Sequence, residues 1–115
     1  MKFAPDGAAG AWLRDFTPDA DSFDWDAGNR SKNEKHDVRS GEIESIFFLE
    51  KFLFAGRITE PEHDEWRGLI LGRSSEGRSL ALIFTRRGDK LRPISCRPMR
   101  PGERRLYEAN IQEHS

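Results

Sequence analysis

The chain has 115 residues, of which 34% are charged and 36% hydrophobic, and its formal net charge is −1, so it can form one domain with a modest core. Its single cysteine, Cys96, excludes a disulfide framework and a cysteine zinc site. No apolar run reaches the roughly 18 residues of a membrane span, and the N-terminus lacks the apolar middle of a signal peptide. We therefore expect a soluble, cytoplasmic protein with no membrane partner.

The first 22 residues are acidic and rich in Ala, Gly, Pro and Asp. Their large apolar side chains are few: Phe3, Trp12, Leu13 and Phe16. A segment with so little to bury is typical of a flexible arm. We expect an arm over residues 1–22 and one domain over residues 23–115, with the alternative that residues 12–16 pack on the domain as a short turn.

Residues 23–26, with the sequence FDWD, alternate aromatic and acidic side chains and predict a short strand. Asp26 is a good N-cap for a helix over residues 27–37. This helix contains almost no apolar residue, so burial alone does not explain its sequence. Lys32 and His36 are four residues apart and share one side of it. The pattern indicates either a functional surface or a solvated helix.

A second helix is expected to begin at Ser40, with Glu42 in its first turn, where a carboxylate favours the helix dipole. Its predicted apolar stripe consists of Ile43, Ile46, Phe47, Phe48 and Leu49, with Glu50 at its end. Such a stripe predicts a helix that lies on a sheet and supplies much of the core. Residues 51–58 predict a strand, and residues 59–65 an acidic loop in which His63 is exposed.

Residues 66–105 predict a three-stranded antiparallel meander, because short stretches of β-formers are separated by turn residues. Gly77 marks one turn, and Gly88 with Asp89 marks the other. Pro101 suits the first position of a final helix that runs to about Asn110. The predicted fold class is α+β: an antiparallel sheet of about four or five strands, two helices before it and one after it.

Charge is divided between the two parts of the chain. Residues 73–105 contain ten basic and three acidic residues, whereas residues 1–72 contain nine basic and fifteen acidic ones. This division predicts a basic sheet surface that attracts phosphate although the total charge is near zero. Side-chain alternation in the last strand places Ile94 and Cys96 on the core side, and Ser95 and Arg97 on the other side.

Three motifs together resemble one family of bacterial toxins. They are a G-N-x-x-K-x-x-K-H block at residues 28–36, a G-R-x-x-x-G-R turn at residues 72–78 and an R-P-I-S-x-R strand at residues 92–97. Over residues 23–108 the chain is similar to the BrnT family of type II toxins. The resemblance implies a RelE-like fold and a ribonuclease that inhibits translation and growth.

The resemblance also implies partners. These are an RNA substrate and a ribbon-helix-helix, BrnA-like antitoxin that binds DNA, so that this chain would contact DNA only indirectly. One departure from the family is Asp37, where the family usually has glycine after Lys-His. Aspartate tolerates a left-handed backbone less well than glycine, at a cost of up to about 1 kcal/mol. Its carboxylate would also lie beside His36 and compete with phosphate, which leaves open whether Asp37 weakens activity or is neutral.

RNA cleavage without a metal needs an acid, a base and cations that stabilise the charge on phosphorus. We predict His36, Lys32, Arg73 and Arg97 as catalytic, since imidazole titrates near neutral pH and guanidinium groups fork onto phosphate oxygens. The predicted RNA-binding residues are Lys35, Arg78, Arg86, Arg87, Ser95 and Arg100. His36, His63 and His114 lack ligand spacing, so no metal or cofactor is expected.

Two alternative functions remain open. The first is a weakened nucleic-acid-binding or antitoxin-binding module, which predicts RNA binding that falls steeply with salt but no cleavage. The second is an interaction domain whose basic face holds an acidic partner, which predicts negligible affinity for RNA. Structural alternatives stay open for Arg73, for Arg97 as a bridge to the last helix, and for Ser95 as a hydrogen-bonding or solvent-exposed group. For Arg86, Arg87 and Arg100 the alternatives are non-specific phosphate contacts or simple solvation.

Overall fold

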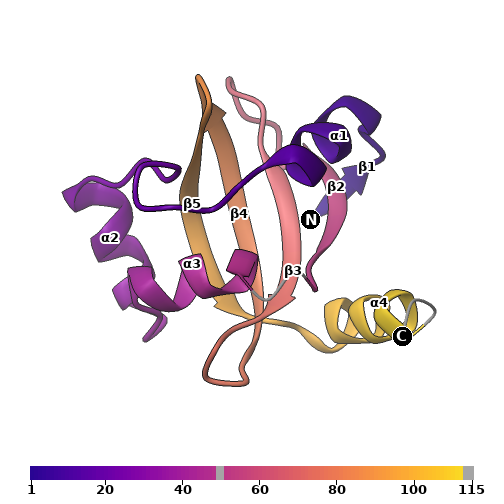
Figure 1. Ribbon diagram of the computed structural model, residues 1–115. Helices are drawn as coiled ribbons and strands as arrows, with labels where there is room; N and C mark the ends of the chain where they lie inside the picture. Colours follow the sequence, from indigo (N-terminus) through magenta and orange to yellow (C-terminus); the bar gives the residue numbers. More distant parts are fainter. Residues whose placement is uncertain (49–50, 113–115) are drawn as a thin grey trace.

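A computed structural model describes residues 1–48 and 51–112 of the chain (Figure 1). Within these residues, five strands form one antiparallel sheet in the order β1-β2-β3-β4-β5. The elements are β1 (Lys2–Ala4), α1 (Gly7–Asp15), α2 (Ala27–Glu34), α3 (Ser40–Phe48), β2 (Leu53–Glu60), β3 (Gly68–Arg73), β4 (Ser79–Arg87), β5 (Lys90–Pro98) and α4 (Pro101–Gln112). The predicted α+β class is confirmed, with three helices before β2 instead of two.

The predicted meander is also confirmed. Strands β3, β4 and β5 pair in sequence, and the hairpins between them close at the two expected glycines. Gly77 has a φ of 80° and Gly88 a φ of 63°. These left-handed values suit glycine because it has no Cβ to clash with the backbone.

Each side of the sheet carries its own apolar cluster. On one side Ile70, Leu80, Leu82, Phe84 and Cys96 pack with Leu13 of α1 and with Ile43, Ile46 and Phe47 of α3. On the other side Leu69, Leu71 and Ala81 pack with Tyr107 of α4. We call these sides the α3 face and the α4 face. The apolar stripe of α3 is thus largely confirmed, but Phe48 is 58% exposed, and Leu49 and Glu50 lie outside the described residues.

The N-terminal segment, predicted as an arm over residues 1–22, contains a strand and a helix. Strand β1 pairs with β2, and Asp6 caps the start of α1: its carboxylate accepts a hydrogen bond from the N–H of Ala9 at 3.1 Å. Leu13 is only 4% exposed, and Phe16 makes an edge contact with Phe47 at a centroid distance of 5.6 Å. A few large side chains are enough here because Leu13, Trp12 and Phe16 join the apolar cluster on the same side of the sheet as α3. The alternative that residues 12–16 pack on the domain describes this region better, although a full helix replaces the turn.

A β-bulge changes the predicted alternation of side chains in β5. Ser95 lies opposite Ile83 and Pro93 lies opposite Phe84, so Ile94 has no partner residue on β4. Cys96 faces the α3 side as predicted, but Ile94 lines a pocket with Arg92 on the other side. The prediction is wrong for Ile94 because the extra residue of a bulge resets the two-residue period.

The predicted strand over residues 23–26 reduces to a single bridge. Phe23 makes one parallel bridge to Leu91, and the N–H of Leu91 donates to the carbonyl of Ser22 at 2.9 Å. This contact brings the start of α2 to the outer edge of β5 (Figure 1). In the part of the chain that the structure describes, no helix has the length and apolar character needed to cross a membrane.

Candidate functional site

Helix α2 lies against the outer edge of β5 and is held there by two buried asparagines. The Nδ2 of Asn29 donates to the carbonyl of Pro93 at 2.9 Å, and the Oδ1 of Asn33 accepts from the N–H of Cys96 at 2.7 Å. Asn29 is 5% exposed and Asn33 is 1% exposed. These side-chain amides take the place of a neighbouring strand. The polar sequence of α2 therefore serves docking by hydrogen bonds.

The beginning of α2 is fixed by a reciprocal capping box. The N–H of Asn29 donates to Oδ1 of Asp26 at 2.9 Å, and the N–H of Asp26 donates to Oδ1 of Asn29 at 2.7 Å. The predicted N-cap at Asp26 is thus confirmed. The hydrogen bonds from Asn29 and Arg92 lower the pKa of Asp26. Sequence reasoning gave the two asparagines no role, although their four-residue spacing on a helix without apolar residues was an available signal.

Docking of α2 decides where its other side chains point. Lys32 lines a pocket together with Arg92. Arg92 follows Leu91, which faces α3, so Arg92 points to the opposite side of β5, the α4 face. Arg30 lies on the other side of the helix, in a hollow shared with Ser40 of α3. His36 lies beyond Glu34, the last residue of α2, in an exposed turn, and its N–H donates to the carbonyl of Asn33 at 3.0 Å. Lys32 thus opens toward the α4 face, whereas His36 lies one turn further along the chain, outside the residues that line this pocket.

The pocket beside Lys32 has a volume of about 540 Å³ and lies where α2, β4, β5 and the loop before β3 meet. We call it the basic pocket. Its charged lining residues are Asp26, Lys32, Glu65, Arg67, Arg87 and Arg92. Four cations against two carboxylates give it a net positive lining. Of these, Lys32 and Arg87 were predicted from the sequence, whereas Arg67 and Arg92 were not.

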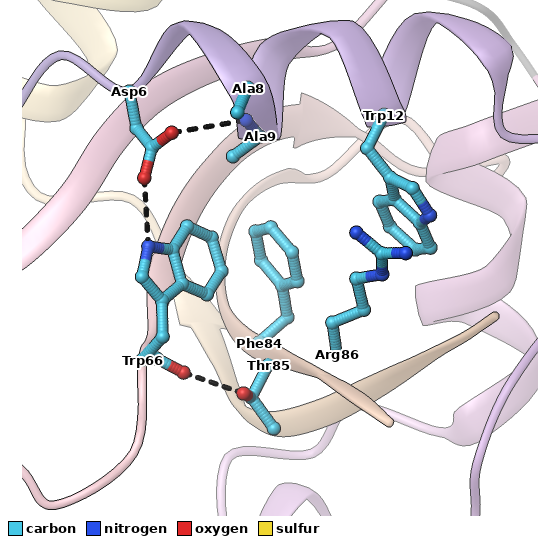
Figure 2. Close-up of a pocket in the computed structure, with 8 residues that line it drawn as sticks. All are labelled: Asp6, Ala8, Ala9, Trp12, Trp66, Phe84, Thr85 and Arg86. Carbon is cyan, nitrogen blue, oxygen red and sulfur yellow. Dashed lines mark hydrogen bonds between the residues drawn. The ribbon is translucent and has the colours of Figure 1, made fainter. Parts of the chain in front are cut away.

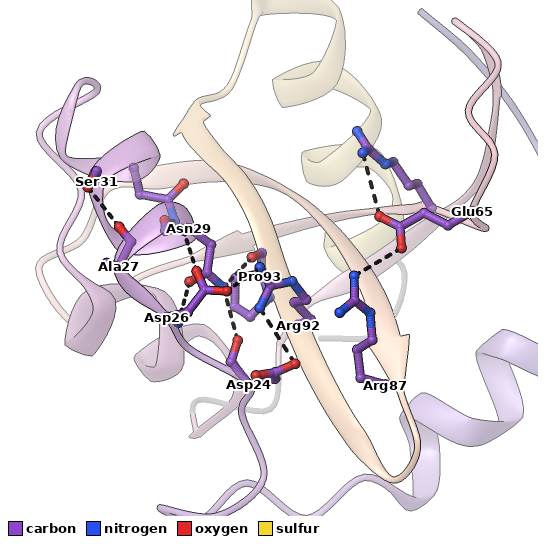
Figure 3. Close-up of polar contacts among 11 residues, drawn as sticks. Asp24, Asp26, Ala27, Asn29, Ser31, Glu65, Arg87, Arg92 and Pro93 are labelled. Atoms are coloured by element: carbon purple, nitrogen blue, oxygen red, sulfur yellow. Dashed lines mark hydrogen bonds and ion pairs between the residues drawn. The ribbon is translucent and has the colours of Figure 1, made fainter.

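Ion pairs neutralise part of this charge, as Figure 3 shows. Arg92 contacts Asp26 at 2.7 Å and Asp24 at 3.5 Å. Glu65 contacts Arg87 at 3.3 Å and Arg67 at 3.5 Å. Acidic residues from residues 1–72 therefore fold onto the basic meander. The surface is less positive than the division of charge along the sequence predicts.

Arg97 lies on the α4 face, opposite Ala81, and forks onto Glu103 in the first turn of α4. The N–O distances are 2.7 and 2.9 Å, and a third N–H donates to the carbonyl of Pro98 at 3.2 Å. Burial opposes the charged form of Glu103, but the hydrogen bonds from Arg97 and from the N–H of Arg100 outweigh it and lower the pKa of that carboxyl. The bridge to the last helix is therefore present. A guanidinium has five N–H groups, and within residues 1–48 and 51–112 Arg97 uses three of them, so two remain for a ligand.

Arg73 and Ser95 share the α4 face with Arg97. Arg73 is exposed at the end of β3, two residues beyond Leu71, which faces α4. Arg73 also lies close to Tyr107 of α4: burial raises the pKa of Tyr107, and the nearby charge of Arg73 opposes that rise. Ser95 is half-buried opposite Ile83. These residues lie on the side of the sheet toward which Lys32 opens.

Arg78 lies elsewhere and acts as a clamp. Its Nε donates to Glu42 of α3 at 2.8 Å, a second nitrogen also bonds this carboxylate, and the carbonyl of Asp37 accepts at 2.6 Å. Glu42 is 8% exposed and also accepts from Ser74 at 2.7 Å. The hydrogen bonds from Arg78, opposed by burial, lower the pKa of Glu42. The clamp ties the β3–β4 hairpin to α3 and to the turn after α2.

Three other predicted residues are spread over the surface. Arg86 lies on the α3 face, where its guanidinium stacks over the ring of Trp12 at 4.7 Å from the centroid. Arg100 is exposed between β5 and α4, and Lys35 is exposed in the turn after α2. Arg86 is thus separated by the sheet from Ser95 and Arg97.

Asp37 occupies the left-handed position that the sequence comparison predicted, with a φ of 57°. Its carbonyl accepts a hydrogen bond from Arg78. This backbone is strained for aspartate and relaxed for glycine.

The fold and the charged α4 face define a small α+β protein of the RelE-like class. Residues 25–103 match the family of ribonuclease toxins, BrnT, of type II toxin-antitoxin systems. The chain belongs to this family, and the resemblance seen in its motifs is confirmed. No curated protein matches it. As a type II toxin it has a cognate antitoxin and an RNA substrate. Residues 1–48 and 51–112 contain no group of three or more His, Cys, Asp or Glu placed to hold a metal ion.

Proposed function

We propose that the protein cleaves RNA without a metal on the α4 face, in the space between α2 and α4. One observation carries the proposal: α2 docks on β5 so that Lys32 opens toward the face that bears Arg97. A phosphodiester in that space would meet cations from α2 on one side and from β5 on the other. Charged donors aimed at a phosphate supply a large part of catalysis in such reactions.

In the proposed reaction the 2′-oxygen of the RNA attacks the phosphorus, and the bond from phosphorus to the 5′-oxygen breaks. The products are a 2′,3′-cyclic phosphate and a 5′-hydroxyl. His36 carries out one of the two proton transfers, either as the base that takes the proton of the 2′-hydroxyl or as the acid that protonates the leaving 5′-oxygen, and solvent water carries out the other. Lys32 stabilises the negative charge. Arg73 and the two unused N–H groups of Arg97 bind the phosphoryl oxygens.

The ion pair with Glu103 suits Arg97 for this role. The bidentate contact holds the guanidinium in one orientation, so little side-chain freedom is lost when the phosphate binds. The pair is also neutral as a whole, so Arg97 acts through positioned N–H groups more than through net charge. Glu103 is then a positioning residue.

We assign binding of the neighbouring phosphates to the basic pocket. Arg87 comes from the predicted set, and Arg67 and Arg92 join it because they line the same cavity. Lys35, Ser95 and Arg100 keep their proposed contacts with RNA. Arg78 is assigned to the clamp with Glu42 instead, because it bonds to α3 and does not lie on the α4 face with Arg97.

The test is cleavage of single-stranded RNA by the purified chain in the presence of a chelator. His36→Ala should reduce the rate about 100-fold or more, the range for loss of a general acid or base. His63→Ala is the matched control, since His63 is also exposed but lies in the loop before β3. Circular dichroism would confirm that both variants are folded. Equal rates for His36→Ala and the wild type would refute the catalytic assignment.

We further propose that the cognate antitoxin is a ribbon-helix-helix protein and that the complex forms in the cytoplasm. DNA would then be contacted through the antitoxin. Co-expression with the product of the adjacent open reading frame should abolish growth arrest and yield a stable complex. An adjacent protein of another fold that still neutralises the toxin would contradict this assignment.

The neutralising ion pairs favour one alternative, a module that binds RNA without cleaving it. They reduce the positive field that attracts phosphate, and Asp37 strains the turn that carries His36. This alternative predicts binding that weakens steeply with salt and no product at any salt concentration. Intact RNA recovered after prolonged incubation would support it.

A further inference from the structure

A second cavity lies on the α3 face, at the end of β4, with a volume of about 280 Å³ (Figure 2). Its lining residues are Asp6, Ala8, Ala9, Trp12, Trp66, Phe84, Thr85 and Arg86. We call it the aromatic pocket. We propose that it binds a nucleobase of the RNA substrate, at a distance from the scissile phosphate. This inference rests on the proposed function.

The walls of the aromatic pocket are flat and apolar. Trp66 and Phe84 meet edge to face at a centroid distance of 5.5 Å and an angle of 71°. Figure 2 shows Trp12 and Trp66 on opposite sides, with Phe84 between them. Both tryptophans are half-buried, so each keeps part of its ring accessible. Aromatic rings of this kind stack on the bases of single-stranded nucleic acids.

Polar groups line the aromatic pocket on two sides of its rings. The two oxygens of Asp6 accept hydrogen bonds from the N–H of Ala9 at 3.1 Å and from Nε1 of Trp66 at 2.9 Å. These bonds, the one from Ala9 first, lower the pKa of Asp6, so the carboxylate is charged at neutral pH. A carboxylate oxygen accepts more than one hydrogen bond, so Asp6 can also accept from the amino group of a base.

Arg86 supplies the complementary donor. Its Nε donates to the carbonyl of Gly88 at 3.0 Å, which fixes the guanidinium over the ring of Trp12. Its terminal nitrogens are directed away from this bond and can donate to a base carbonyl or to the adjoining phosphate. An acceptor, a donor and stacked rings in one small cavity are the features that recognise a base.

The position of the aromatic pocket relative to the basic pocket supports an RNA ligand. Arg86 lines one pocket and Arg87 the other, because neighbouring residues of a strand point to opposite faces. Trp66 and Arg67 divide in the same way. A single RNA strand that passes over this end of the sheet can therefore occupy both pockets.

Part of the aromatic pocket lies outside the segment that matches the family. Asp6 and Trp12 lie in the segment before residue 25, where the family match begins. Without α1 the cavity would lose one wall. The proposed subsite would therefore give this toxin a base preference that the family motifs do not encode.

The test uses Trp12→Leu, which keeps an apolar side chain and removes the ring. Affinity for a single-stranded RNA of about ten nucleotides, measured by fluorescence anisotropy on the His36→Ala background, should fall about tenfold, because Arg86 loses the ring that holds its guanidinium in the pocket as a stacking and donor surface. Trp25→Leu is the matched control, since Trp25 also carries an arginine, Arg30, over its ring at 5.5 Å but lies outside the pocket. Its affinity should be unchanged.

Three further measurements keep the result interpretable. Thermal unfolding would show that both variants remain folded, and Arg86→Gln, which leaves the aromatic walls in place, should weaken binding in the same direction. A free mononucleotide should compete poorly with the RNA, because it cannot reach both pockets at once. Full competition by a mononucleotide, or unchanged affinity of both folded pocket variants, would overturn the proposal.

Cleavage of a dinucleotide separates this inference from the proposed function. A dinucleotide spans only the scissile bond, so wild type and Trp12→Leu should cut it equally. A Trp12→Leu defect on the dinucleotide would overturn the subsite. If the wild type cuts neither the dinucleotide nor longer RNA, the proposed function fails, and the anisotropy result still decides whether a base binds.

Discussion

The two faces of the sheet hold an arginine against a carboxylate of a different helix. On the side of α3, Arg78 makes three hydrogen bonds, to the carboxylate of Glu42 and to the carbonyl of Asp37. On the α4 face Arg97 also makes three, to Glu103 and to the carbonyl of Pro98, and it lies on the side toward which Lys32 opens. Because the two guanidinium groups are equally engaged, the proposed functional arginine differs from the structural one in its position and not in the number of its bonds. Substitutions in the clamp of Arg78 and Glu42 should therefore change stability, and those around Arg97 should change activity.

The largest stability effect is expected for Glu42→Gln. This change removes the charge that binds Arg78, and it should lower the free energy of unfolding at pH 7 by about 2–3 kcal/mol. Because the pKa of Glu42 is lowered by folding, its stabilising contribution is complete above the unfolded value of 4.5 and is lost as the pH falls through the folded value. Urea unfolding of both proteins at several pH values measures this.

The difference in unfolding free energy between wild type and Glu42→Gln should thus be constant from pH 6 to 8 and shrink below about pH 4.5. Glu44→Gln is the control, since Glu44 lies two residues away on α3 and is half-buried without this clamp. A difference that stays constant down to pH 3 would show that the ion pair is not its source.

A smaller loss is expected where α2 meets β5. Asn33→Ala leaves the N–H of Cys96 without its partner, which should cost about 1–2 kcal/mol of unfolding free energy. It should also reduce cleavage, because α2 carries Lys32 and leads into the turn that carries His36. Hydrogen exchange of the Cys96 amide measures the local effect. Unchanged protection of this amide would mean that α2 does not close the edge in solution.

A gain of up to about 1 kcal/mol is expected for Asp37→Gly, because glycine adopts the left-handed backbone without strain. Removing the carboxylate beside His36 should also raise the cleavage rate. Thermal unfolding and cleavage assays test the two effects separately. Asp37→Asn is the useful comparison, since it removes the charge and keeps the side chain.

The smallest stability effect is expected for Lys32→Ala. The lysine is exposed, so the free energy of unfolding should change by less than about 0.5 kcal/mol, while cleavage should fall at least tenfold. Lys51→Ala, at an exposed position before β2, should change neither quantity. Normal cleavage by folded Lys32→Ala would remove the α2 side from the proposed site.

The elements with strong local signals were predictable from the sequence. Gly77 and Gly88 defined the hairpins, Asp26 defined the start of α2, and the apolar positions Ile43 and Ile46 defined the buried side of α3. The left-handed turn at Asp37 was anticipated from the glycine expected there. Each of these depends on a few neighbouring residues, which is the information that a local pattern contains.

The features that were missed depend on contacts between distant residues. The bulge at Ile94 arises from pairing with β4, and the packing of α1 depends on Phe47 and Phe23 more than on its own composition. The pairing of Arg92 with Asp26 could not be read from charge counts, because those counts do not say which residues meet. Residue type was therefore enough to select the candidate site residues, but only the fold showed which other residues they contact.

The asparagine contacts at β5 also limit how the antitoxin can bind. Many proteins capture a partner by adding its strand to an exposed sheet edge. From Leu91 to Cys96 that edge already bonds to the segment before α2 and to α2 itself. An antitoxin strand could join there only by displacing α2, and with it the lysine and histidine of the proposed site, so strand addition at this edge would itself switch the toxin off.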